Sequence, residues 1–116
     1  MIRTIASCTL PDADDGERWD IHIIDGAITA IEPARGVRGA DVLDADGLCA
    51  VPGLTNAHTH TPMSLMKGAA EDVGVDDWFN LRVWPMEVNL TPERVRVGAR
   101  LALAEMLLAG VTGFAD

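Results

Sequence analysis

The sequence predicts an α/β protein in which a small antiparallel β-sheet, over residues 1–50, precedes a parallel strand–helix–strand unit that begins in residues 51–116. Two observations favour this fold class. Two apolar stretches flank an Asp25-Gly26 pair, which is the strongest short signal for a β-hairpin because both turn positions favour positive φ. Farther along, an apolar run, a long helical pattern and a second apolar run follow one another, as in a βαβ unit.

The first fifty residues contain the signals of four or five strands. Residues 2–10 are rich in β-branched and small side chains, and residues 19–24 alternate, so that Trp19, Ile21 and Ile23 share one face. His22 is on the polar face and is expected at the surface. Residues 27–31 complete the hairpin, and residues 41–44 form a short strand before an Asp-Gly turn.

The second half begins with an apolar run over residues 48–57, which is typical of a buried parallel strand. Pro52 and Gly53 interrupt the run, so the strand is expected to start after Gly53. The long stretch from 61 to 90 has no strand signal. Short helices are expected there near 63–67 and near 76–82, the second one ending before Pro85.

One long helix is predicted after this stretch. Thr91 is a suitable N-cap, Pro92 suits the first helical position, and Glu93 favours the positive end of the helix dipole. Apolar side chains recur with helical spacing, and Gly110 is the expected C′ residue. Residues 111–115 then form a second buried strand.

The predicted parallel part is too small to be complete. Parallel strands need partners on both sides and covering helices, which two strands and one helix cannot supply. A (β/α)₈ barrel needs about 250 residues, whereas this chain has 116. We therefore expect an N-terminal piece of a longer protein: a β domain over 1–50 and an incomplete barrel domain over 51–116.

Composition argues against several classes of partner. The chain has 18 acidic and 9 basic residues and a net charge of −9, with a single lysine. Phosphate neutralisation requires clustered Lys and Arg, so neither nucleic acid nor an anionic membrane is expected as a partner. No apolar run reaches the ~18 residues that span a bilayer. Cys8 and Cys49 lie far apart without CxxC spacing, which favours a reducing compartment, the cytoplasm. Both cysteines are expected to be small buried side chains.

His58-Thr59-His60 is the feature that carries chemistry. In a strand, residues i and i+2 point to the same side, so two imidazoles converge as ligands of one metal. Catalytic zinc takes about three protein ligands and keeps an open position, so two histidines are an incomplete site. The alternative is an accidental pair near a loop.

The residues around this pair resemble a known family. The segment VPGLTNAHTH, residues 51–60, resembles the first barrel strand of the amidohydrolase superfamily. The continuation resembles the branch that holds the 5-methylthioadenosine/S-adenosylhomocysteine deaminases and the triazine chlorohydrolases. Its matching segments are TPMSLMKG (61–68), WPME (84–87) and LTPE (90–93).

The resemblance implies a metal-dependent hydrolase built from a small β-sandwich and a (β/α)₈ barrel. His58 and His60 would be two ligands of one divalent metal, usually zinc and sometimes iron. Glu87 aligns with the carboxylate that binds the ribose hydroxyls of a nucleoside, and the alternative for it is a solvated loop acid. Catalytic residues are expected beyond residue 116. Asp116 receives no role. Trp78 and Trp84 are expected to be packing residues of the long loop, and Trp84 is the better alternative candidate for lining a base pocket.

Three hypotheses stay open for the function. The complete protein deaminates an adenosine-type nucleoside, or it is a chlorohydrolase or deaminase of another aminated ring such as a triazine or guanine. The third hypothesis is that the piece by itself is non-catalytic. In the first two the partner is a small-molecule substrate, and a homodimer of the complete protein is compatible with both.

Overall fold

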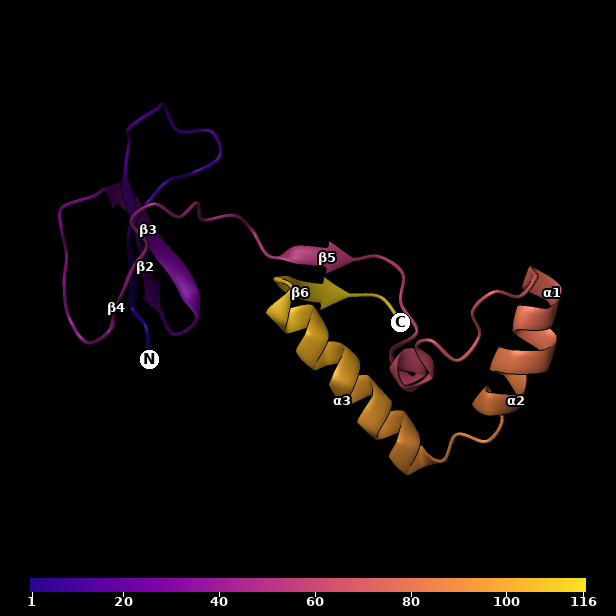
Figure 1. The fold of residues 1–116 in the computed structure, drawn as a ribbon. Helices are drawn as coiled ribbons and strands as arrows, with labels where there is room; N and C mark the ends of the chain where they lie inside the picture. Colours follow the sequence, from indigo (N-terminus) through magenta and orange to yellow (C-terminus); the bar gives the residue numbers. More distant parts are fainter. The chain divides into compact units, whose positions relative to one another are not determined.

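The computed structural model describes residues 1–116 and divides into two compact units, Met1–Pro52 and Gly53–Asp116 (Figure 1). No helix in it is both long and apolar enough to cross a bilayer. The assignment of the two halves to a sandwich and a barrel domain stays a prediction.

The first unit is a four-stranded sheet in the order β3-β2-β1-β4. Its strands are β1 (Thr4–Cys8), β2 (Trp19–Ile24), β3 (Ala27–Pro33) and β4 (Val42–Asp44). The predicted hairpin is confirmed: β2 and β3 are antiparallel, and the turn residues Asp25 and Gly26 have φ of 51° and 79°.

The prediction of a purely antiparallel sheet is wrong. β4 pairs with β1 in parallel, Thr4 opposite Val42 and Ala6 opposite Asp44. The chain leaves β3 at one edge of the sheet, and residues 34–41 carry it to the other edge, where it enters beside β1 in the same direction. The sheet is therefore mixed.

Asp20 is completely buried, although the alternation of β2 places it on the polar face. Its carboxylate accepts two backbone hydrogen bonds, from the Ser7 N–H at 2.9 Å and from the Arg35 N–H at 3.0 Å. Ser7 has a φ of 63° at a shift in the β1–β2 register. Asp20 thus ties this irregular point of β1 to the loop that follows β3.

Replacing Asp20 with alanine is expected to lower the free energy of unfolding by about 2–4 kcal/mol, because the backbone N–H groups of Ser7 and Arg35 lose the buried carboxylate that accepts from them. Chemical denaturation of the wild type and variant measures the difference. Asp15→Ala is the matched control, since Asp15 is exposed in the preceding loop, and its effect should stay within about 0.5 kcal/mol. Equal effects of the two substitutions would contradict the role given to Asp20.

The core of the first unit explains why the two cysteines differ. Cys8 packs with Ile21 and Ala45 in the core, and burial raises the pKa of its thiol, so it stays protonated at neutral pH. The prediction that Cys49 is also buried is wrong. Cys49 pairs with Thr9 through one isolated bridge, outside the named strands, and its side chain is exposed.

The second unit confirms the predicted strand–helix–strand order. β5 (Leu54–Asn56) and β6 (Val111–Phe114) form a parallel pair, and the long helix α3 (Pro92–Leu108) precedes β6. β5 is followed by a 3₁₀ helix, η1 (Thr61–Met66). In Figure 1 β5 and β6 lie side by side and the chain end lies beside η1.

The helical stretch before α3 differs from its prediction. It comprises α1 (Val75–Asp77), the π-helical segment η2 (Trp78–Val83) and α2 (Trp84–Glu87), so it continues through Pro85 instead of ending before it. The π turn explains this, because the Trp84 N–H bonds to the Phe79 carbonyl. Pro85 then falls at the start of a new α segment, where its missing N–H costs little.

Both predicted ends of α3 are confirmed. Thr91 Oγ1 accepts a hydrogen bond from the Arg94 N–H at 3.3 Å, and Gly110 has a φ of 79°. Gly98 and Ala102 are the buried residues of this helix. Gly98 lies against the backbone of Pro62 in η1. Because glycine has no side chain, α3 and η1 can approach each other closely at this point.

Candidate functional site

The two histidines of the His-x-His segment lie together just after β5. The ring centroids of His58 and His60 are 5.1 Å apart, and the ring planes are at 88°. Two imidazole nitrogens at about 2.0–2.1 Å from one tetrahedral metal place their ring centroids about 5 Å apart. The pair therefore fits two positions on one divalent metal. No group of three or more His, Cys, Asp and Glu side chains in residues 1–116 could hold a metal, so the two histidines alone would be an incomplete ligand set.

Backbone hydrogen bonds hold this segment in place. The His58 N–H donates to Asn56 Oδ1 at 3.1 Å, and the Thr59 N–H donates to the Ala115 carbonyl at 3.2 Å. Thr61 donates twice to Asp116, from its N–H at 3.0 Å and from its hydroxyl at 2.5 Å. The backbone is thus anchored on both sides of His60, although the two imidazoles themselves are exposed.

His60 and Glu87 line the same hollow. Its volume is about 280 Å³. The other lining residues are mostly apolar and come from η1, α3 and the segments beside them: Pro62, Met63, Leu90, Val95 and Asp116. The structure therefore brings a predicted metal ligand and the predicted substrate carboxylate to one place. His58 is in contact with His60 but does not line the hollow.

Glu87 ends α2 with an exposed carboxylate. It takes part in none of the salt bridges of the chain, so its oxygens are open to a ligand's hydroxyl groups. An ionised carboxylate accepts charge-assisted hydrogen bonds, which are stronger than those between neutral groups. A polar ligand in this hollow would find the Glu87 carboxylate as an acceptor beside apolar walls.

Trp84 does not line this hollow. Its side chain is 53% exposed, and its ring stacks at a tilt against Phe79 with centroids 5.9 Å apart. Phe79 also lies 6.5 Å from Trp78. The three aromatic rings follow one another along η2 and the start of α2, as expected for packing residues, and a place for Trp84 in a base pocket stays a prediction.

Asp116 also lines the hollow, although no role is predicted for it from the sequence. The hydrogen bonds from the Thr61 side chain and backbone lower the pKa of its carboxyl, so it is ionised at neutral pH. The stabilisation belongs to the ionised form: it is present above the ordinary pKa and is lost as the pH falls through the lowered value. Nothing local predicts this contact, because Thr61 lies 55 residues away.

Gly98 was also missed, although the sequence contains a signal for it. A glycine inside a helical pattern costs about 1 kcal/mol relative to alanine, and this cost points to close packing. The structure supplies the packing partner, which is Pro62, immediately after Thr61. Gly98 therefore sets how closely α3 approaches the turn beside His60.

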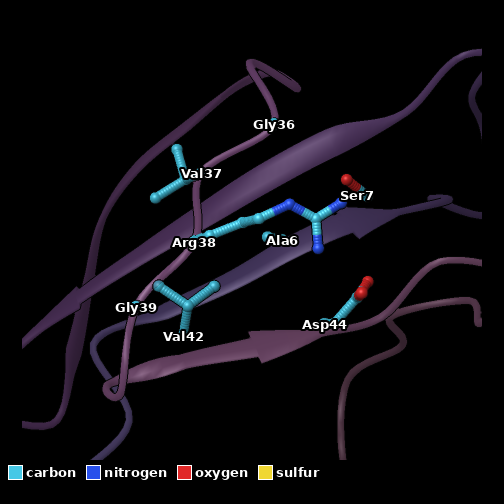
Figure 2. A pocket seen from close by; sticks show the side chains of 8 residues that line it. All are labelled: Ala6, Ser7, Gly36, Val37, Arg38, Gly39, Val42 and Asp44. Carbon is cyan, nitrogen blue, oxygen red and sulfur yellow. The ribbon is translucent and has the colours of Figure 1, made fainter.

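A smaller hollow of about 150 Å³ lies in the first unit, where the loop at 36–39 passes over β1 and β4. Figure 2 shows the Arg38 side chain extending across Ala6 toward Ser7, with Asp44 on the neighbouring strand. This hollow contains no histidine or cysteine side chain. The pair of histidines predicted as metal ligands follows β5 and does not line this hollow.

Comparison with known proteins identifies the family. The sequence profile described as "Amidohydrolase family" matches residues 49–116, which include both histidines, Glu87 and Asp116. The chain belongs to the amidohydrolase family. Membership implies a TIM-barrel hydrolase, and amidohydrolases are generally metal-dependent. The predicted resemblance to the amidohydrolase superfamily is thereby confirmed.

Several curated relatives of this amidohydrolase chain have related names. It is 42% identical, over 91% of its length, to a protein of Methanosarcina mazei named 5'-deoxyadenosine deaminase. Proteins named 5-methylthioadenosine/S-adenosylhomocysteine deaminase are 41% identical in Haloarcula marismortui and 40% in Thermococcus kodakarensis, over 86% and 88% of this chain. In each comparison the chain spans 24% of the relative's length.

Proposed function

We propose that the complete protein containing these residues is a metal-dependent amidohydrolase that hydrolytically deaminates an adenosine-type nucleoside modified at the 5′ position. 5-Methylthioadenosine, S-adenosylhomocysteine and 5'-deoxyadenosine are the substrates in the names of its relatives. The observation that carries the proposal is the hollow shared by His60 and Glu87. It combines a metal-ligand position with an anionic group suited to a sugar.

His58 and His60 would hold a divalent metal, which is zinc or iron. They would bind it as neutral imidazoles and would not donate or accept a proton in the reaction. When bound, the metal supplies the Lewis acidity that makes water a nucleophile near neutral pH. The net reaction replaces the amino group of the ring with oxygen from water and releases ammonia.

Glu87 would orient the nucleoside through its ribose. A carboxylate has two oxygens and can accept one hydrogen bond from each hydroxyl of a vicinal diol. Met63, Leu90 and Val95 supply apolar surface beside it. The sugar would therefore be fixed at one end of the hollow, and the base would extend toward the His60 side.

The fold of the complete protein follows the same proposal. The sheet of β1–β4 would be part of a β-sandwich, and β5, α3 and β6 would form the first βαβ portion of a (β/α)₈ barrel. The ends of β5 and β6 would then lie at the catalytic face, where the βα loops of such barrels gather. The remaining metal ligands and the general acid–base group would come from later strands.

Glu87→Gln tests the proposal through substrate choice. Two charge-assisted hydrogen bonds are weakened, so kcat/KM for 5'-methylthioadenosine is expected to fall about 100-fold, with turnover of ring substrates that lack ribose unchanged. Steady-state ammonia release from 5'-methylthioadenosine, adenine, guanine and an aminotriazine gives the comparison. Glu93→Gln is the matched control, because Glu93 is an exposed glutamate on the first turn of α3 that pairs with Arg96.

The same assay decides between the alternatives. If Glu87→Gln has equal effects on substrates with and without ribose, or none at all, Glu87 does not bind a sugar. Wild-type activity on an aminated or chlorinated triazine, with none on nucleosides, would favour the second hypothesis over nucleoside deamination.

A further inference from the structure

The segment that carries the histidines is paired with the end of β6. The Ala115 N–H donates to the Asn56 carbonyl at 2.9 Å, and the Thr59 N–H donates to the Ala115 carbonyl at 3.2 Å. The parallel pairing of β5 and β6 therefore continues past both strands and reaches the residue before His60. One side of His60 is fixed by this ladder.

The other side of His60 is fixed by Asp116. Both oxygens of its carboxylate accept hydrogen bonds from a single residue, Thr61, which is only 3% exposed. Two contacts from one carboxylate determine the position of the Thr61 N–H and of its side chain together. The His60 carbonyl in turn accepts a hydrogen bond from the Met63 N–H at 3.0 Å, at the start of η1.

We propose that Asp116 is a positioning residue for the metal ligand His60 and acts through Thr61. It holds the backbone that carries His60, so that the imidazole is presented to the metal together with that of His58. Because its two oxygens are directed at Thr61, Asp116 is not itself assigned as a ligand. This inference rests on the proposed metal-dependent function.

Zinc affinity of the complete protein is the test, measured by competition with a chromophoric chelator. Outer-shell partners of metal ligands are worth about 10–100-fold in affinity, and Asp116 acts one residue farther out, so Asp116→Ala is expected to raise the zinc Kd about 10-fold. Thr61→Val removes the hydroxyl and should weaken binding in the same direction. Thr61→Ser keeps the hydroxyl and should restore wild-type affinity.

Two further measurements separate positioning from general loosening of the structure. The visible spectrum of the Co²⁺-substituted protein should change in Asp116→Ala, because the ligand geometry changes. It should not change in Glu105→Ala, the matched control, which breaks the Lys67–Glu105 ion pair in the same unit. The double variant Asp116→Ala/Thr61→Val should bind zinc no more weakly than Asp116→Ala alone. Asp116→Ala already removes the hydrogen bond from the Thr61 hydroxyl, so Thr61→Val has no further contact with Asp116 to remove.

A zinc Kd of Asp116→Ala within twofold of the wild type would overturn the inference and leave the proposed function intact. Loss of a zinc equivalent at saturating metal would make Asp116 a ligand and would also overturn it. A wild-type protein that binds no divalent metal would instead refute the proposed function, and this inference with it. If Asp116→Ala does not fold, Thr61→Val provides the comparison, since it removes the hydroxyl contact and keeps the Thr61 N–H as a donor to Asp116.

Discussion

His60→Ala is expected to weaken divalent-metal binding by the complete protein by at least about 100-fold, since even outer-shell changes cost 10–100-fold. The ring centroid of His60 lies 5.1 Å from that of His58, as the centroids of two ligands of one metal do. Metal-dependent turnover should fall at least as far. Chelator competition with zinc measures the affinity, and ammonia release measures turnover.

His22→Ala is the matched control for this substitution. His22 is the one other histidine of the chain and lies in β2, where its Nδ1 is 3.2 Å from the Thr4 hydroxyl and its Nε2 is 3.4 Å from Glu32. Its loss should leave the metal affinity unchanged. If His60→Ala bound zinc as tightly as His22→Ala does, His60 would not be a ligand.

Gly98→Ala is expected to destabilise the protein by about 2–3 kcal/mol, as overpacking does. Helix propensity alone predicts the opposite, a gain of about 1 kcal/mol. A Cβ at this position, however, would lie 2.9 Å from Pro62 Cα and nearer still to the Pro62 carbonyl oxygen. Both are backbone atoms, so η1 must move away from α3, and the backbone beside His60 moves with it.

Gly74→Ala is the control, because a Cβ there meets nothing within 4 Å and Gly74 has a φ of −64°. Urea denaturation should place Gly98→Ala well below the wild type and Gly74→Ala within about 0.5 kcal/mol of it. The zinc affinity should also fall in Gly98→Ala alone. A Gly98→Ala protein more stable than the wild type would show that α3 and η1 are not closely packed.

Elements that depend on neighbouring residues could be predicted from the sequence. The Asp25-Gly26 turn, the Thr91 cap and the Gly110 stop each require a particular conformation at one or two residues, and the residue types reveal it. The parallel pairing of β1 with β4 and the burial of Asp20 could not be predicted in this way. Both depend on where the loop after β3 returns to the sheet, which no local pattern determines.

The candidate site likewise has residues that local patterns predict and one that depends on a distant contact. The spacing of His58 and His60 is a local signal, and the resemblance to amidohydrolases added Glu87. Their roles stay predictions, to which the structure adds the shared hollow of His60 and Glu87. Asp116 could not be found from the sequence, because its only polar partner is Thr61, at the other strand's end.

Metal-dependent release of ammonia by the complete protein is the central property of the proposed function. We would assay 5'-methylthioadenosine with metal-stripped protein and again after addition of zinc or Fe²⁺. We expect no release from the stripped protein and restored release on reloading, at one metal per chain. Release that is unaffected by stripping, or none with any metal on any 5′-substituted adenosine, would contradict it.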